Sequence, residues 1–272
     1  MSEPMLPDLL PVTPGGPVPI ADGDADVPGA DKDALKDELK QLRKRIAGLQ
    51  EAFHADGRHA LLVILQGRDA SGKDGTIGAV FQGVNPQGIR VTAFKQPTPE
   101  ELAHDFLWRV HRAVPPRGTI GLFNRSHYED VLVVRVNELV PRAAWEDRYQ
   151  RINDFERHLA ANGVVILKFF LHISREEQRV RLLERLDDPR KQWKFNAGDL
   201  KERARWDVYT EAYEAALSRC STAEAPWYVV PADRNAVRNV LVARTVLAAL
   251  EQLKPEFPPA TPEALELRAS IR

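Results

Sequence analysis

Strand-length runs of apolar residues alternate with stretches of helical periodicity from about residue 58 to residue 255. Several of these runs are apolar at nearly every position, as expected for strands covered on both faces. Strands joined by helical stretches predict a parallel sheet flanked by helices, which is an α/β fold. The predicted strands are Ala60–Leu65, Ile89–Phe94, Thr119–Phe123, Val164–Ile173 and Trp227–Val230.

A helix is predicted ahead of the first strand. Its apolar positions recur at alternating spacings of four and three, with Lys, Arg, Glu and Gln between them. Such a stripe either packs on the chain's own domain or forms a coiled-coil contact between subunits. Six positions do not decide between the two, and we favour packing within the domain. The stripe consists of Leu35, Leu39, Leu42, Ile46, Leu49 and Phe53.

Both ends of the chain are rich in proline. Residues 1–31 carry seven prolines among Gly and Asp, with few large apolar residues. A segment of this kind buries too little surface to offset its ordering entropy, so we expect a disordered tail. Residues 256–272 are expected to form a loose C-terminal extension with a short last helix. One domain over residues 32–255 lies between them.

The composition excludes several classes of protein. A formal net charge of −1 gives no general attraction to nucleic acid, so an anion site has to come from local clustering. The single cysteine, Cys220, excludes an internal disulfide framework and is expected of a cytoplasmic enzyme. No apolar run approaches the ~20 residues of a membrane helix. No basic stretch precedes an apolar core at the N-terminus, so no signal peptide is expected either.

A phosphate-binding loop follows the first predicted strand. The pattern Gly67-x-x-x-x-Gly72-Lys73 comes directly after it, and a helical stretch comes next. Glycines let backbone N–H groups converge on phosphate oxygens, the helix N-terminus adds its positive dipole end, and the lysine adds a mobile charge. This context favours a phosphate cradle over a structural glycine turn. The predicted phosphate-binding residues of the loop are Gly67, Arg68, Ala70, Ser71, Gly72, Lys73 and Asp74.

The loop departs from its common form after the lysine. Asp74 stands where Ser or Thr normally supplies a magnesium ligand. Magnesium takes one or two carboxylates together with phosphate oxygens and water. We therefore expect Asp69, inside the loop, to bind the metal, with capping of the loop backbone as its alternative role. Arg68 either raises the positive potential at the mouth of the loop or is a surface arginine.

A polar cluster follows the third predicted strand. Asn124 stands at the strand tip, where a carboxylate is usual, and Arg125 comes next. An arginine here stabilises the charge that develops on a transferring phosphoryl group. Glu129 and Asp130 either supply the missing negative charge for a metal or begin a solvated helix. The pattern does not choose between these two acids.

A cation-rich segment lies beyond the fourth predicted strand. Ten arginines and lysines occur between Arg175 and Arg205. Such a segment is either a solvated helix face or a lid that closes over phosphates, here over about residues 185–205. The basic residues outnumber what two or three phosphates need, which favours a substrate with many phosphates. Nucleic acid is disfavoured, because the basic density is confined to one segment.

Five segments, in order along about residues 35–252, resemble the polyphosphate kinase 2 family. The resemblance implies a thymidylate-kinase-like P-loop fold with a central five-stranded parallel sheet and a helical lid. It also implies magnesium-dependent phosphoryl transfer between inorganic polyphosphate and nucleotides. The segments are Leu65–Thr76 (LQGRDASGKDGT), Ala93–Thr98 (AFKQPT), Phe123–Val131 (FNRSHYEDV), Asp188–Lys194 (DPRKQWK) and Ala225–Asp233 (APWYVVPAD).

The resemblance implies roles for individual residues. Asp69 is similar to the loop carboxylate that binds metal, Lys73 to the phosphate-gripping lysine, and Arg125 to the arginine at the transferring group. These three are the expected catalytic residues. The metal is Mg²⁺, with Mn²⁺ as the alternative. The polyphosphate-binding residues that the resemblance adds are Lys95, Arg185, Arg190, Lys191 and Lys194.

Asn124 departs from the Asp found at this strand tip in much of the family, which weakens its assignment as a metal ligand. The variant resembles the subgroup that phosphorylates both nucleoside mono- and diphosphates. In that subgroup an acid near Glu129 or Asp130 serves the metal instead. The implied net direction is from AMP and ADP to ATP, with polyphosphate as the donor.

We therefore expect residues 32–255 to be a P-loop phosphotransferase domain. The acceptor phosphate is already anionic, so catalysis rests on alignment and charge neutralisation. The expected partners are polyphosphate, adenine nucleotides (guanine nucleotides as an alternative) and further copies of the chain, but not nucleic acid or a membrane. Three other functions are weighed. An ATP-dependent nucleoside monophosphate kinase shares the loop, lid and fold. A non-catalytic nucleotide-binding module would lack the arginine and the acids. Nothing in the sequence suggests the third, a phosphotransferase of the same family that acts on a protein or phospholipid.

Overall fold

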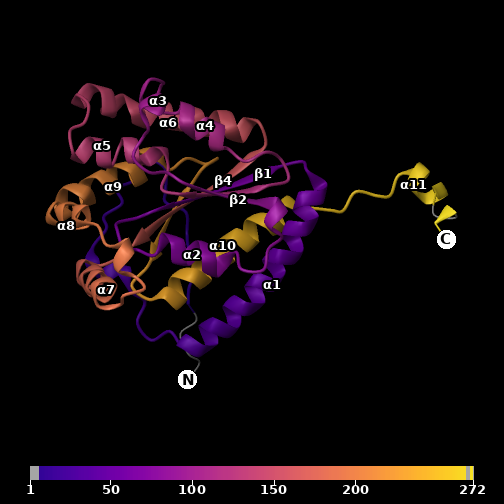
Figure 1. Cartoon of the computed structure of the whole chain (residues 1–272), viewed down its shortest axis with the longest axis horizontal. Helices are drawn as coiled ribbons and strands as arrows, with labels where there is room; N and C mark the ends of the chain where they lie inside the picture. The colour runs from indigo at the N-terminus through magenta and orange to yellow at the C-terminus, as the bar shows by residue number, and fades with distance from the viewer. Residues whose placement is uncertain (1–5, 268–269, 272) are drawn as a thin grey trace.

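A parallel sheet with strand order β2-β3-β1-β4-β5 lies at the centre of the structure, a computed structural model that describes residues 6–267, 270 and 271 (Figure 1). All neighbouring strands pair in parallel. The predicted fold class is confirmed, and no end of a predicted strand is more than one residue from its observed position. The strands are β1 (Ala60–Gln66), β2 (Ile89–Ala93), β3 (Ile120–Asn124), β4 (Val164–His172) and β5 (Trp227–Pro231).

Helices cover both faces of the sheet (Figure 1). One face is covered by α1 (Lys32–Asp56), α2 (Lys73–Val80) and α10 (Asn235–Leu253). The other is covered by α4 (Trp108–Ala113), α6 (Arg142–Ala161) and α9 (Trp206–Cys220). The remaining helices are α3 (Pro99–Leu102), α5 (Val133–Val136), α7 (Arg175–Asp187), α8 (Ala197–Ala204) and α11 (Pro262–Leu267). Short 3₁₀ turns are η1 (Asp22–Ala25), η2 (Pro86–Gly88), η3 (His127–Asp130) and η4 (Gln192–Lys194).

Strand β1 contributes to two hydrophobic cores. Leu61, Val63 and Leu65 belong to the core beneath α1 and α10. Leu62 and Ile64 belong to the core on the opposite face. Successive side chains of a strand point to opposite faces, so a strand covered on both sides is apolar throughout. Burial of every residue of β1 explains the unbroken apolar run that predicted it.

Helix α1 lies along α10. It begins after Asp31, whose carboxylate accepts a hydrogen bond from the N–H of Asp33 at 2.8 Å, and ends at Gly57 in the left-handed conformation. The apolar stripe faces inward, with Leu49 half-buried and the other five positions buried. The stripe therefore packs within the domain in this structure, as the favoured interpretation holds.

The segment from residue 6 to residue 31 differs from the expected disordered tail. It runs along the domain, where the N–H of Val12 bonds to Trp227 O at 2.8 Å and His172 Nε2 contacts Ala21 O at 2.7 Å. Its apolar residues Leu6 and Ile20 are buried. The prediction failed because the segment has no core of its own and uses the core and hydrogen-bond donors of the folded domain. Residues 1–5 of the expected tail lie outside the described residues.

The C-terminal extension leaves the domain after α10. Helix α11 lies apart from the sheet and its helices (Figure 1), and the short last helix expected in residues 256–272 is present. Residues 268, 269 and 272 lie outside the described part of the chain. The domain limits at residues 32 and 255 stay predictions. None of the described helices combines the length and the apolar character needed to cross a bilayer.

Candidate active site

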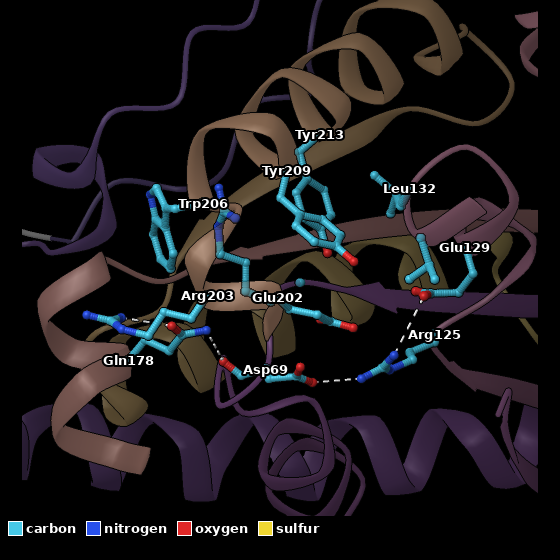
Figure 2. A pocket seen from close by; sticks show the side chains of 13 residues that line it. Asp69, Arg125, Glu129, Leu132, Gln178, Glu202, Arg203, Trp206, Tyr209 and Tyr213 are labelled. Atoms are coloured by element: carbon cyan, nitrogen blue, oxygen red, sulfur yellow. Dashed lines mark hydrogen bonds and ion pairs between the residues drawn. The ribbon is translucent and has the colours of Figure 1, made fainter. Parts of the chain in front are cut away.

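Three segments that follow adjacent strands meet at the carboxyl edge of the sheet, around a small cleft (Figure 2). The loop after β1 supplies one wall, the turn after β3 the second, and helices α7 to α9, which follow β4, the third. The free space inside is ≈ 20 Å³, room for about one water molecule. Helices α7 to α9 therefore pack directly on the loop. Residues lining the cleft include Asp69, Arg125, Glu129, Gln178, Glu202 and Trp206.

The phosphate-binding loop runs from Gly67 to Lys73, as the pattern predicts. Gly67 passes so close to β4 that a Cβ atom there would lie 2.7 Å from Leu171 O. Gly72 has a φ of 96°, a conformation that favours glycine, where α2 begins. Ala70 also has a positive φ, 65°, which is unfavourable for a residue with a side chain. A strained backbone at this position is typical of functional loops.

Lys73 is buried inside the loop. Its ammonium donates hydrogen bonds to Gly67 O at 2.6 Å and to Arg68 O at 3.2 Å. Burial, and next the nearby charge of Arg125, lower its pKa to about 8. A lysine held this way gains a strong electrostatic partner when an anion enters the loop.

Arg125 connects the loop to the turn after β3. Its N–H bonds to Leu65 O at 3.0 Å, and its φ is 62°, so the residue leaves the strand in a constrained conformation. Its guanidinium contacts Asp69 at 2.7 Å and Glu129 at 3.6 Å, as Figure 2 shows. Burial opposes the charge, but Glu129 and Asp69 raise the pKa of Arg125 above its ordinary value. The three residues form one charged row across the floor of the cleft.

Glu202 reaches this row from the lid helix α8, and pattern reasoning missed it. Glu202 and Asp69 both line the cleft and lie close enough for their charges to interact. Burial first, and then the charge of Asp69, raise the pKa of Glu202 to about 8. Asp69 itself is buried, but Lys73 and Arg125 hold its pKa below the usual range. The sequence offered no signal for it, because the cation-rich segment holds several other acids, such as Asp188 and Asp199.

The structure separates the two acids that the sequence leaves equivalent. Glu129 lines the cleft. Asp130 points to α6, where it pairs with Arg148 at 2.7 Å, and burial raises its pKa to about 6. Only Glu129 is therefore placed beside Asp69 and Arg125.

A buried polar network supports the turn that carries these acids. Lys168 of β4 donates to Glu156 of α6 at 2.5 Å and to the Tyr128 hydroxyl at 2.8 Å. His127 Nε2 lies 3.1 Å from the same carboxylate. Because each of these four side chains is buried, the pairing fixes turn η3 against the core.

Asn124 and Asp74 are brought together at the edge of the loop. The side-chain N–H of Asn124 donates to a carboxylate oxygen of Asp74, and neither residue is among those that line the cleft. Asn124 ends β3, directly beside Leu65 of β1. The pair thus joins the first turn of α2 to the tip of β3.

Arg68 is not a surface arginine. Its guanidinium is buried and stacks on the ring of Trp206, with the carbon Cζ 3.8 Å from the ring centroid. It also donates to the hydroxyl of Thr210. Burial lowers the pKa of Arg68, and its contacts tie the loop to helix α9; the residue also lines the cleft.

The other expected polyphosphate-binding residues lie outside the cleft. Lys95 is exposed, beyond the end of β2. The lid cations pair with acids of the lid itself: Arg185 with Asp199 at 3.3 Å, and Arg190 and Lys191 with Asp188 at 3.2 and 3.7 Å. Lys194 lies over the exposed ring of Trp193.

Comparison with known proteins assigns the family. The sequence model described as polyphosphate kinase 2 (PPK2) matches residues 29–258. The chain belongs to the polyphosphate kinase 2 family. An AMP/ADP-polyphosphate phosphotransferase of Meiothermus ruber is 56% identical to it, over 84% of this chain and 85% of the relative. An ADP-polyphosphate phosphotransferase of Rhodopseudomonas palustris is 46% identical, over 88% and 89% of the two chains.

A solved structure agrees with this assignment. The crystal structure of polyphosphate kinase 2 from Arthrobacter aurescens has a TM-score of 0.87 with 40% identity, and the match covers 97% of this chain and 98% of that one. The predicted family, the P-loop kinase fold and the class of enzyme, a polyphosphate kinase 2 type phosphotransferase, are thereby confirmed. A phosphotransferase of this family implies a divalent metal ion.

Proposed function

We propose that this polyphosphate kinase 2 transfers the terminal phosphoryl group of inorganic polyphosphate to AMP and to ADP, giving ADP and ATP. The observation that carries the proposal is the row Asp69–Arg125–Glu129 beside the buried Lys73, in a cleft at the phosphate loop. The relative that is 56% identical over the matched residues is named for both AMP and ADP, which supports use of the two acceptors.

In the proposed reaction the chain binds and aligns two anionic substrates. The loop N–H groups and the ammonium of Lys73 bind the terminal phosphate of the donor. The guanidinium of Arg125 stabilises the charge on the transferring group, which is the main contribution that a protein makes to this chemistry. The lid helix α8 covers the loop and excludes water, so the phosphoryl group passes to the nucleotide rather than to solvent.

The donor set in the cleft fits Mg²⁺. Asp69, Glu129 and Glu202 all line the cleft, and carboxylate oxygens are ligands that a divalent cation prefers. Within the described ranges no three His, Cys, Asp or Glu side chains form a preassembled metal cluster. Asp69 and Glu129 would hold the ion, and substrate phosphates and water would complete its ligands, the arrangement that magnesium favours. When bound, the ion reduces the repulsion between donor and acceptor oxygens.

The test is an assay of the purified full-length protein with Mg²⁺, AMP and either polyphosphate or ATP as the donor. We expect ADP and then ATP to accumulate with polyphosphate. Turnover of AMP with ATP as the donor, but not with polyphosphate, would contradict the proposal and would indicate a nucleoside monophosphate kinase. Binding of nucleotide without turnover would indicate a non-catalytic module.

We extend the proposal to the cellular context. The nucleotide substrates and the absence of any cysteine besides the buried Cys220 support a cytoplasmic location. A homo-oligomer and the use of guanine nucleotides are further parts of the proposal, to be tested by light scattering and by replacing AMP with GMP in the same assay.

A further inference from the structure

Arg238 of helix α10 is buried beneath the phosphate loop. Its side chain is 2% exposed. Its Nη1 donates to Ser71 O at 3.1 Å and to the side chain of Asn235 at 2.7 Å, while Nε and Nη2 donate to Asn239 at 3.2 and 3.1 Å. A Cβ atom on Gly72 would overlap Nη1, so the guanidinium lies directly against the loop backbone.

The charge of Arg238 has no acidic partner among the residues that the structure describes: no carboxylate comes within ion-pair distance of it. Burial, and next the charge of a second arginine, Arg181, lower its pKa to about 9. An arginine stays protonated at neutral pH even when buried. A buried charge without a counterion is destabilising unless something else compensates it.

Arg181 and Arg238 hold two successive carbonyls of the loop. Arg181 of α7 donates to Ala70 O at 3.0 Å, and Arg238 donates to Ser71 O at 3.1 Å. In a trans peptide the C=O and the following N–H point in opposite directions. The Ser71 carbonyl that faces Arg238 therefore directs the N–H of Gly72 away from Arg238, toward the other side of the loop.

We propose that Arg238 is a positioning residue for phosphate binding, and that its charge is compensated across the loop by the bound phosphate. The inference rests on the proposed function, because it takes the terminal phosphate of polyphosphate as the anion at the Gly67–Lys73 loop. Arg238 never touches this phosphate. It orients a backbone donor and supplies positive potential from behind the loop, where solvent ions do not screen it.

Two substitutions separate charge from hydrogen bonding. Arg238→Gln removes both the charge and the planar fork but keeps a polar side chain. Arg238→Lys keeps the charge and removes the planar fork. The matched control is Arg244→Gln on the same helix, since Arg244 is paired with Glu38 and contacts Leu6 O, remote from the loop.

The experiment measures Kd for tripolyphosphate and for ATP by calorimetry, and the unfolding temperature of each free protein. We expect Arg238→Gln to raise both Kd values at least about tenfold, the scale of one poorly screened charge. Its unfolding temperature should be equal to or above that of the wild type, since the uncompensated charge is gone. Arg238→Lys should recover most of the affinity, and Arg244→Gln should bind like the wild type.

Two results with the variants would overturn the inference. Wild-type Kd values in Arg238→Gln would show that the charge does not act on the phosphate. Equal loss of affinity in the Gln and Lys variants, with lower unfolding temperatures in both, would show a structural role only. If the wild type bound ATP but not tripolyphosphate, the proposed donor would be wrong. The Kd values of the variants for ATP would then decide the inference about Arg238. A wild type that binds neither would overturn both.

Discussion

The charge of Lys73, buried in the phosphate loop, depends on whether a phosphate is bound there. Burial and Arg125 lower its pKa to about 8 in the free protein. A bound phosphate favours the ammonium, so binding raises this pKa. Below pH 7 the lysine is already protonated, and binding takes up little. Above pH 8 the free protein is mostly neutral at Lys73, so phosphate binding takes up a proton and weakens as the pH rises further.

Proton uptake can be measured by calorimetry with tripolyphosphate in two buffers of different ionisation enthalpy. At pH 8.5 we expect the wild type to take up about 0.7 proton more than Lys73→Arg, whose guanidinium stays charged. The comparison between the two proteins cancels the titration of the ligand itself. Equal uptake in both proteins would show that Lys73 is not the titrating group.

Lys73→Met is expected to lose at least about 10³-fold in kcat, because the charge at the transferring group is lost.

Glu129 and Asp130 are neighbours in sequence, but one faces the cleft and the other faces helix α6. This difference leads to a second prediction. Glu129 contacts Arg125 in the cleft, whereas Asp130 pairs with Arg148 of α6. We expect Glu129→Gln to lower kcat about tenfold or more and to raise the Mg²⁺ concentration needed for half-maximal rate. Asp130→Asn should leave that concentration unchanged. Titrating the rate with Mg²⁺ in both variants checks this; a larger metal effect in Asp130→Asn would reverse the assignment.

At the scale of elements, the N-terminal segment is part of the domain. Its residues Leu6 and Ile20 are buried, and Asp22 accepts from the N–H of Arg175, at the start of α7, at 3.2 Å. Each buried apolar side chain contributes about 1.5–3 kcal/mol to the free energy of unfolding. The conformational entropy lost when the segment is ordered offsets part of this contribution. We expect deletion of residues 1–28 to lower the free energy of unfolding by about 2 kcal/mol.

A deletion at the other end is the control for this third prediction. The described residues of α11 make their backbone hydrogen bonds locally, as from the Leu265 N–H to Thr261 O. Removal of residues 258–272 is therefore expected to leave stability unchanged. Denaturant unfolding of the three chains gives the comparison. An N-terminal deletion that is as stable as the full chain would show that the segment adds nothing to the fold.

The elements differ in how far sequence predicts them. The strands and the Gly67–Lys73 loop follow from local patterns, since burial on both faces makes a strand apolar and a phosphate cradle needs glycine. Glu202 and Arg238 were not predictable, because their roles depend on which helices pack on the loop. The choice of Glu129 over Asp130 needs the position of Arg148. The N-terminal segment was predicted disordered from its composition, which carries no information about the surface that it covers.

At the scale of the whole molecule, charge is distributed unevenly. The net charge is only −1, yet cations are concentrated between α7 and α9. Lys191 and Lys194 lie in the exposed turn between α7 and α8, outside the cleft. If polyphosphate extends from the loop across this turn, these lysines attract the distal part of the chain. We do not expect AMP to reach them, because it carries a single phosphate.

This gives a fourth prediction: the position of the two lysines, and not the net charge of the protein, determines the affinity for long polyphosphate. Changing Lys191 and Lys194 together to Gln should raise KM for long polyphosphate about three- to tenfold at low salt, and less at 0.5 M salt, where exposed charges are screened. KM for AMP should not change. The control replaces Arg151 and Arg157 of α6, also exposed, by Gln, which lowers net charge by the same amount. If the control raised KM for polyphosphate equally, the molecule would attract its donor through overall charge, and the lid would hold no channel. An effect confined to the lid variant would instead place the path of the polyphosphate chain over the turn between α7 and α8.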